Sequence, residues 1–226
     1  MTELDHVALW GRSFDEYRRM FSLSDRDLLR KMVGVGDGPA SFNAEACAVG
    51  ASIISCDPLY QFDAADIAKR IDDVFPEVMT QLRANQSSFR WQEIASVTQL
   101  GELRRRAMDT FLRDYAQGRG AGRYVAASLP ELPFEDDQFE LAVCSHLLFT
   151  YASQLDQDFH EASIREMLRV AGELRVFPLL GFDGKPVVFL KQLVTTLKNL
   201  GHRPTIEQVA YEFQVGGNEM LRVVRG

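Results

Sequence analysis

A glycine-rich turn between two apolar runs is the feature of this sequence that most constrains its fold. The stretch Met32–Phe42 passes from apolar residues into Gly36–Pro39, and a second apolar run, Ala51–Cys56, ends at Asp57. Glycines in such a turn let the backbone approach a ligand closely, because no Cβ stands in the way. An acid at the carboxyl end of the second strand is placed to accept hydrogen bonds from two ribose hydroxyls. The pattern therefore predicts a β-α-β unit that binds a nucleoside cofactor.

The composition limits both the class of protein and its partners. A chain of 226 residues with 46% hydrophobic residues can bury one sizeable core, which predicts a single domain over residues 1–226. The net charge of −7 argues against nucleic acid as a partner, because electrostatic binding to nucleic acid needs a basic surface. Three cysteines without a C-x-x-C pair predict a reducing compartment, with neither a disulfide framework nor a metal site.

Targeting and membrane signals are not found in the sequence. The first residues, Met1–His6, lack the basic and apolar regions of a signal peptide. No segment approaches the roughly 18 uninterrupted apolar residues of a membrane span. We therefore expect a cytoplasmic protein with no membrane partner, and the sequence leaves its oligomeric state open.

Strand and helix signals alternate along the chain. Short apolar runs predict strands at residues 31–35, 51–57, 123–127, 139–145 and 173–180. Helices are expected at residues 39–49, 159–170 and 186–200, and two further strands, 208–214 and 219–224, around a glycine turn. Strands that alternate with helices and are buried on both faces form a parallel sheet with right-handed crossovers.

A helical insertion is expected between about residues 63 and 117, where we find no convincing strand. It is longer than a crossover helix needs, and segments above the carboxyl ends of the strands are placed to roof a ligand crevice. Its aromatic residues at helical spacing are more often core than substrate contacts; they are Phe75, Trp91, Phe111 and Tyr115. The run Arg104–Arg106 has acids around it on a helix and is expected to form a solvated face.

The chain resembles class I S-adenosylmethionine-dependent methyltransferases, and in particular an uncharacterised bacterial branch of them. The resemblance extends from about Met32 to the C terminus and rests on the order and spacing of several segments. These are Gly36–Glu45, Cys56–Pro58, Leu132–Leu141, Ser145–Phe149 and Tyr211–Leu221. It implies an α/β fold with a Rossmann-like seven-stranded, mostly parallel sheet, helices on both faces and a reversed C-terminal strand. It also implies S-adenosylmethionine as the cofactor and a small-molecule methyl acceptor.

The resemblance further implies a set of cofactor contacts, which are Gly34, Gly36, Asp37, Gly38, Asp57, Pro58, Ser128, Leu129 and Ser145. The family usually has an acid two residues before the first loop glycine, where this chain has Gly34. Asp37 is placed to substitute for it in part. Gly34→Asp is expected to tighten binding if the missing carboxylate is what weakens it, and no gain would mean that Asp37 or another group already serves the methionine end. The family also often has an acid after the third strand, where this chain has Ser128; its hydroxyl and the Leu129 backbone can still contact a base.

The candidate catalytic residue is His146, which follows the fourth strand, where this family presents residues to the transferred methyl group. Methyl transfer mainly requires that the acceptor lie close behind the methyl carbon. An imidazole has a suitable pKa near neutrality to remove a proton from the acceptor. The alternative is a structural role, in which His146 caps the strand or bonds a neighbouring carbonyl. His160 is expected on the surface, and His6 and His202 carry no signal.

Two other functions stay open. An NAD-dependent oxidoreductase needs a third glycine and a helix N-terminus that faces a diphosphate, and this chain places Asp37 beside that diphosphate. The second is a non-catalytic S-adenosylmethionine or nucleoside-binding protein of the same fold, because a fold does not establish an activity. Gly34 and Ser128, where the family has acids, favour the binding protein over the enzyme.

Overall fold

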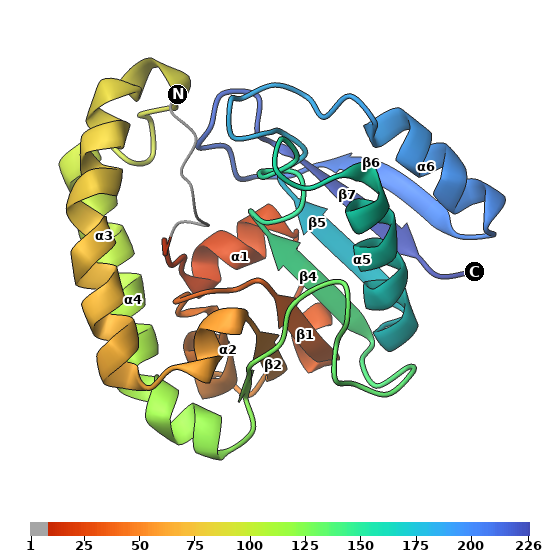
Figure 1. Cartoon of the computed structure of the whole chain (residues 1–226), viewed down its shortest axis with the longest axis horizontal. Coiled ribbons are helices and arrows are strands. Elements are labelled where there is room, and N and C mark those ends of the chain that lie inside the picture. The colour runs from red at the N-terminus through yellow and green to blue at the C-terminus, as the bar shows by residue number, and fades with distance from the viewer. Residues whose placement is uncertain (1–8) are drawn as a thin grey trace.

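In the computed structural model, which describes residues 9–226, a seven-stranded sheet is flanked by helices (Figure 1). The strands are β1 (Lys31–Val35), β2 (Ser52–Cys56), β3 (Tyr124–Val125), β4 (Leu141–Ser145), β5 (Glu173–Phe177), β6 (Arg203–Gln208) and β7 (Glu219–Val224). The α-helices are α1 (Phe14–Met20), α2 (Phe42–Ala48), α3 (Ala64–Ala84), α4 (Val97–Gly120), α5 (Gln157–Val170) and α6 (Leu190–Asn199). Met1–His6, from which a signal peptide was argued to be absent, lie outside the described residues. Within residues 9–226, no helix combines the length and apolar character that crossing a bilayer needs.

The strands follow the order β3-β2-β1-β4-β5-β7-β6. β1 pairs in parallel with both β2 and β4. The pairs β2–β3 and β4–β5 are also parallel. β7 runs antiparallel to both of its neighbours, β5 and β6. This arrangement confirms the predicted Rossmann-like, mostly parallel sheet with a reversed C-terminal strand. The strand order reverses direction between β1 and β4, and the crevice beyond the carboxyl ends of strands at such a point is where open α/β sheets bind ligands.

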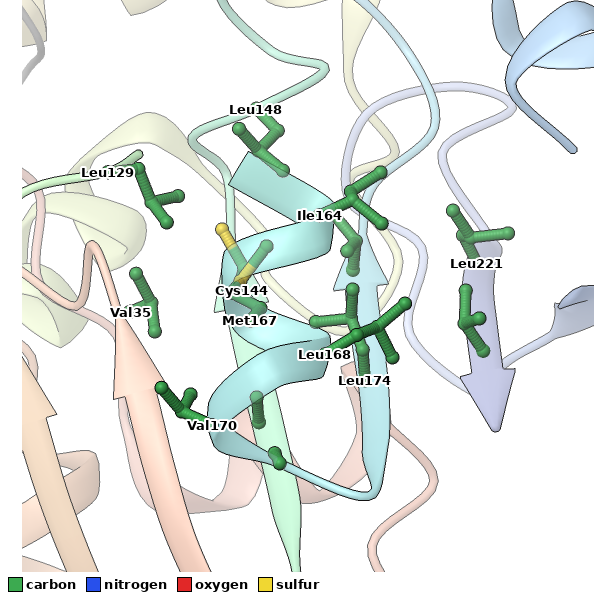
Figure 2. Close-up of a cluster of buried hydrophobic side chains, with 14 of the residues drawn as sticks. Val35, Leu129, Cys144, Leu148, Ile164, Met167, Leu168, Val170, Leu174 and Leu221 are labelled. Carbon is green, nitrogen blue, oxygen red and sulfur yellow. The ribbon is translucent and has the colours of Figure 1, made fainter. Parts of the chain in front are cut away.

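Apolar side chains cover both faces of the sheet, because successive strand residues point to opposite sides. Val33 and Val35 of β1 join the cluster that α5 and α6 cover, whereas Met32 joins the cluster under α1 and α2. Figure 2 shows α5 lying over the strands, with Met167 and Cys144 close together in this cluster. The two faces together hold the core, and the strand ends between them are left to form a site.

The first strand of the C-terminal pair lies earlier than predicted. We expected residues 208–214, but β6 is Arg203–Gln208, and residues 209–218 form the connection to β7. The alternating Val209, Tyr211 and Phe213 pack against the core instead of pairing in the sheet. β6 is polar and mostly exposed and contains a proline, which is tolerated because it is an edge strand. Smaller differences are that α2 begins at Phe42, and that β3, β4 and β5 are shorter than expected.

The insertion forms two long helices, α3 and α4, which pack against each other at one side of the sheet (left in Figure 1). Asp63 and Ser96 cap their N-termini by accepting hydrogen bonds from the backbone N–H groups of Asp66 and Gln99. Against our expectation of a solvated face, Arg104 is only 1% exposed and shares the inner face of α4 with Leu100 and Met108. These apolar residues four positions away on either side are the sequence signal that places Arg104 inside.

The guanidinium of Arg104 joins α4 to α1. Its two terminal nitrogens donate to the carboxylate oxygens of Glu16 over 2.6 and 2.7 Å. Glu16 also forms a capping box with Ser13 at the start of α1. The ion pair therefore attaches the insertion to the helix that lies next to the glycine turn.

His160 is also buried, not exposed as expected. It lies on the inner face of α5 with Ile164 and Met167, at the spacing of a helical turn and two turns. Its ring nitrogens lie 2.6 Å from the carbonyl oxygen of Asp156 and 2.9 Å from that of Leu148. The second contact holds the segment that follows β4.

We expect Arg104→Ala to lower the free energy of unfolding by about 3–5 kcal/mol, because it leaves a buried carboxylate without its cation. Burial raises the pKa of Glu16, but the charge and hydrogen bonds of Arg104 outweigh it and hold that pKa at about 2. Glu16 is therefore charged at neutral pH, where urea unfolding measures the loss. Arg105→Ala is the matched control: its exposed pair with Asp72 contributes about 1 kcal/mol or less. Equal losses of unfolding free energy in the two variants would contradict a stabilising role for the buried Arg104–Glu16 pair.

Candidate functional site

A cavity of about 510 Å³ lies at the carboxyl ends of β1, β2 and β4. It gathers most of the site residues expected from the sequence, namely Gly36, Asp37, Gly38, Asp57, Pro58, Ser128, Leu129, Ser145 and His146. Gly34 does not line it. Parallel strands end at the same edge of a sheet, which is why residues so far apart in the chain meet here.

Asp37 is buried inside the glycine turn and accepts two side-chain hydrogen bonds. The hydroxyl of Tyr17 in α1 donates to Oδ1 over 2.9 Å, and the hydroxyl of Ser55 in β2 donates to Oδ2 over 2.6 Å. Burial raises the pKa of Asp37 to about 7, although both hydrogen bonds oppose the rise. The carboxyl group therefore changes its charge near neutral pH, and a cationic ligand beside it would favour the charged form.

The carboxylate of Asp37 occupies the space that a side chain at position 34 would need. A Cβ on Gly34 would lie 1.9 Å from Oδ2 of Asp37. Asp37 thus brings a carboxylate next to position 34. An acid at position 34 would have to displace the Asp37 carboxylate, which favours the alternative that Asp37 already serves the methionine end.

Gly36 makes the close approach that the glycine turn predicted. Its φ of +72° is a conformation that side chains rarely adopt, and a Cβ there would lie 2.6 Å from Cδ2 of Leu147. Leu147 follows β4, so glycine at this position lets the turn after β1 pack directly against the segment after β4.

Asp57 fastens the glycine turn to the end of β2. Its Oδ2 accepts a hydrogen bond from the backbone N–H of Gly38 over 2.9 Å, and its Oδ1 from that of Leu59 over 2.8 Å. The second bond caps the 3₁₀ turn Pro58–Gln61, so Asp57 also has a structural role. Each carboxylate oxygen has a further lone pair, so Asp57 can still accept hydrogen bonds from a ligand.

His146 lies at the end of β4 in a left-handed backbone conformation, with φ of +51°. Its backbone N–H donates to the carbonyl of Phe177 over 2.7 Å, and its ring Nδ1 lies 2.8 Å from Oγ of Ser145. Burial, together with the charges of Arg12 and Arg104, lowers the pKa of His146 well below its usual value. The imidazole is therefore neutral near pH 7, and a weaker base than we expected from the sequence. Unusual backbone conformations of this kind cluster at functional sites.

A second, smaller cavity of about 150 Å³ adjoins the first and is walled by aromatic rings, which we call the aromatic cavity. The rings belong to Trp10, Phe89, Tyr151, Phe177, Phe182, Tyr211 and Phe213. Four residues line both cavities and stand at their junction: Trp10, Arg12, His146 and Tyr151. The insertion contributes Val78, Gln81, Leu82, Asn85, Phe89 and Arg104 to its wall. Phe111 and Tyr115, two aromatic residues singled out in the sequence, instead pack in the core with Tyr60.

Several residues of the site were not found from the sequence. Ser55 is a polar residue within an apolar strand, and Tyr17 lies on an aromatic helix face; these were the available signals for the two partners of Asp37. Arg12 precedes α1 and has no pattern around it that indicates a site. Only the folded chain brings it to the junction of the cavities.

No known family profile matches the chain. An uncharacterised protein of Methanocaldococcus jannaschii, MJ0045, is 33% identical over 223 residues, a match that covers 98% of each chain. This relative is archaeal, so it lends no support to the bacterial branch that the resemblance indicated.

Among solved structures, the mitomycin 7-O-methyltransferase MmcR is similar, with 12% identity and a TM-score of 0.51; the match covers 94% of this chain and 54% of MmcR. Magnesium protoporphyrin IX methyltransferase from Synechocystis PCC 6803 has 10% identity and a TM-score of 0.48, over 94% of this chain and 91% of that enzyme. The chain therefore belongs to the family of the M. jannaschii protein MJ0045, and its fold is the Rossmann-like fold of MmcR.

Proposed function

We propose that the protein is an S-adenosylmethionine-dependent methyltransferase that acts on a small-molecule acceptor. The observation that carries the proposal is the carboxyl group of Asp37, buried inside the glycine turn of a ligand-sized cavity. S-adenosylmethionine has a cationic sulfonium and a cationic ammonium group and no phosphate, so this carboxylate favours it. The same carboxylate disfavours the diphosphate of a nicotinamide cofactor. MmcR, which shares the fold, is by name a methyltransferase.

The residues of the larger cavity fit the parts of this cofactor. Asp57, at the end of β2, would accept hydrogen bonds from the ribose hydroxyls, with Pro58 beside it. Ser128 and Leu129, which follow β3, would contact the adenine. Asp37, in the turn between Gly36 and Gly38, would hold the ammonium group of the methionine end. Ser145 borders the cavity from β4.

The aromatic cavity is the proposed acceptor site, and the insertion at about residues 63–117 forms part of its roof. When bound, S-adenosylmethionine would supply the methyl group, and the acceptor must lie in line behind it. His146 stands where the two cavities meet, and its Nδ1 is engaged with Ser145. Its Nε2 has no hydrogen-bond partner within residues 9–226, so the neutral ring can orient an acceptor or take its proton through that nitrogen.

The function is tested first by binding. Calorimetry should show saturable binding of S-adenosylhomocysteine and none of NAD. Asp57→Ala should weaken that binding by a few kcal/mol, because hydrogen bonds to a charged acceptor are lost. Melting temperature must be followed in parallel, since the variant also loses the bonds to Gly38 and Leu59. Saturable heat with NAD alone, or an unchanged dissociation constant in a folded Asp57→Ala, would contradict the assignment.

The raised pKa of Asp37 predicts a pH dependence of stability with a defined sign. The pKa is about 7 in the folded chain and about 3.9 in the unfolded chain, so the protonated carboxyl stabilises the fold fully below pH 4. This stabilisation is lost as the pH rises through 7. We therefore expect cofactor-free Asp37→Asn to melt above the unsubstituted protein at pH 8, with the difference shrinking towards pH 4. It should also bind S-adenosylhomocysteine more weakly at pH 8.

Thermal melting at several pH values checks the predicted difference in stability, with a substitution of an exposed acid, Asp158→Asn, as control. A constant difference between Asp37→Asn and the unsubstituted protein across this pH range would show that the carboxyl does not titrate as assigned.

His146→Asn should lower the rate of methyl transfer on the order of 100-fold, the usual range for loss of a general base. Affinity for S-adenosylhomocysteine should hardly change, because the loss falls on the transition state. Asparagine is chosen because it tolerates the left-handed backbone at this position. Transfer of radiolabelled methyl groups to a panel of small-molecule acceptors measures the rate. A variant that melts early and transfers at the normal rate would assign His146 a structural role.

A further inference from the structure

Three residues that line the aromatic cavity each carry a buried polar side-chain atom without a hydrogen-bond partner. The atoms are Nε of Arg12, Nε of Arg104 and Oγ1 of Thr150. In the described part of the chain, only two more such side-chain atoms occur, on Arg19 and Ser163, and neither residue lines this cavity. A buried polar group left unpaired costs about 1–3 kcal/mol. Their concentration in one cavity indicates a ligand that offers hydrogen-bond acceptors there.

The wall of the aromatic cavity also carries an excess positive charge. Both carboxylate oxygens of Glu16 are occupied, Oε1 by Arg104 and Tyr211, and Oε2 by Arg104 and Ser13. Arg12 has one hydrogen bond, 3.4 Å long, from Nη1 to the carbonyl of Trp10. No ion pair in residues 9–226 includes it. Of the two guanidinium groups in the wall, only that of Arg104 therefore has a carboxylate partner.

A guanidinium group does not lose its proton in proteins, so this charge persists. Arg12 is partly buried, and a partly buried charge without a partner carries a desolvation cost that an anionic ligand would reduce. A carboxylate suits the site well, because its two oxygens match the planar fork of a guanidinium.

The size and walls of the cavity limit what carries the anion. Its volume is about 150 Å³, and an apolar cavity of about that size is known to hold a single benzene ring. The rings of Trp10, Phe177 and Tyr211 offer faces and edges against which another aromatic ring packs favourably. One flat six-membered ring therefore fits the space.

We propose that the methyl acceptor is a monocyclic hydroxylated aromatic acid, with its carboxylate on Arg12 and its hydroxyl beside His146. This inference rests on the proposed methyltransferase function. In the step that follows, a bond forms between the acceptor oxygen and the methyl carbon while the carbon–sulfur bond breaks. The electron pair of that bond stays on sulfur, and the hydroxyl proton passes to Nε2 of His146. The products are the aryl methyl ether, S-adenosylhomocysteine and the imidazolium.

The carboxylate would also improve His146 as a base. The charges of Arg12 and Arg104 help to lower the pKa of His146, and an anion beside them offsets both. Arg12 lines the cofactor cavity too, so a carboxylate on Arg12 has two sources, the acceptor and the methionine end of the cofactor. Arg104 and Thr150 line the aromatic cavity and not the cofactor cavity, which favours the acceptor.

The test uses two probes of nearly the same shape, 4-hydroxybenzoate and the neutral 4-hydroxybenzamide. Their binding is titrated by calorimetry at pH 7, with and without saturating S-adenosylhomocysteine. We expect 4-hydroxybenzoate to bind at least ~10-fold more tightly, which is the effect of pairing a buried charge. Absent or equal binding of the two probes would overturn the inference. Binding of S-adenosylhomocysteine in the same experiment is read separately, so the proposed cofactor use can stand when the acceptor class fails.

The source of the anion is decided by Arg12→Gln, with Arg105→Gln as the matched control, because Arg105 pairs with Asp72 of α3 and does not line the aromatic cavity. Arg12→Gln should abolish the preference for 4-hydroxybenzoate and leave the dissociation constant of S-adenosylhomocysteine unchanged. Weaker binding of S-adenosylhomocysteine with the preference intact would assign Arg12 to the cofactor and overturn the proposal. Arg12→Lys, which keeps the charge, should retain most of the preference and serves if the glutamine variant does not fold. Loss of the preference in Arg105→Gln as well would also count against it.

Discussion

The buried carboxyl group of Asp37 is the contact on which the arrangement of the site depends. It receives hydrogen bonds from α1 through Tyr17 and from β2 through Ser55, while its own backbone belongs to the turn after β1. Three elements therefore meet at one side chain, and glycine at position 34 is required to make room for it. The cost of burying this group is visible in its raised pKa, and a cationic ligand would offset that cost.

A second buried charge system places the roof of the site. Arg104 on α4 pairs with Glu16 on α1, so the insertion is attached to the same helix that supplies Tyr17 to Asp37. The larger cavity contains the carboxyl groups of Asp37 and Asp57, and the guanidinium of Arg12, which has no ion-pair partner in residues 9–226, lies where the two cavities meet. His146 lies between them, and its lowered pKa reflects its burial and the charges on the guanidinium side. Groups of both charges therefore lie close to the boundary that the two cavities share.

The parts of the fold that sequence reasoning predicted are those specified by local patterns. The turn at Gly36–Gly38, the acid at Asp57 and the apolar run ending at Ser145 each follow from neighbours in the chain, and a parallel sheet brings their ends together. Where the pattern was ambiguous, the prediction was wrong: the alternation around Tyr211 indicated a strand, but the aromatic side chains pack into the core. Arg104 and His160 were expected at the surface because they are polar, but their helical positions put them among apolar residues in the interior.

The sequence alone determined the class of fold and the glycine turn, because strand periodicity and the φ range of glycine are local properties of the chain. Only the tertiary structure decided which charges have partners. The carboxylate of Asp37 occupies the space in which a side chain at position 34 would lie. Arg12 is left without a carboxylate partner because Ser13, Arg104 and Tyr211 already occupy Glu16. The pairing of buried charges depends on groups that are far apart in the chain, and the energy of each pair depends on how deeply it is buried. A local sequence pattern therefore cannot predict which buried charges are paired.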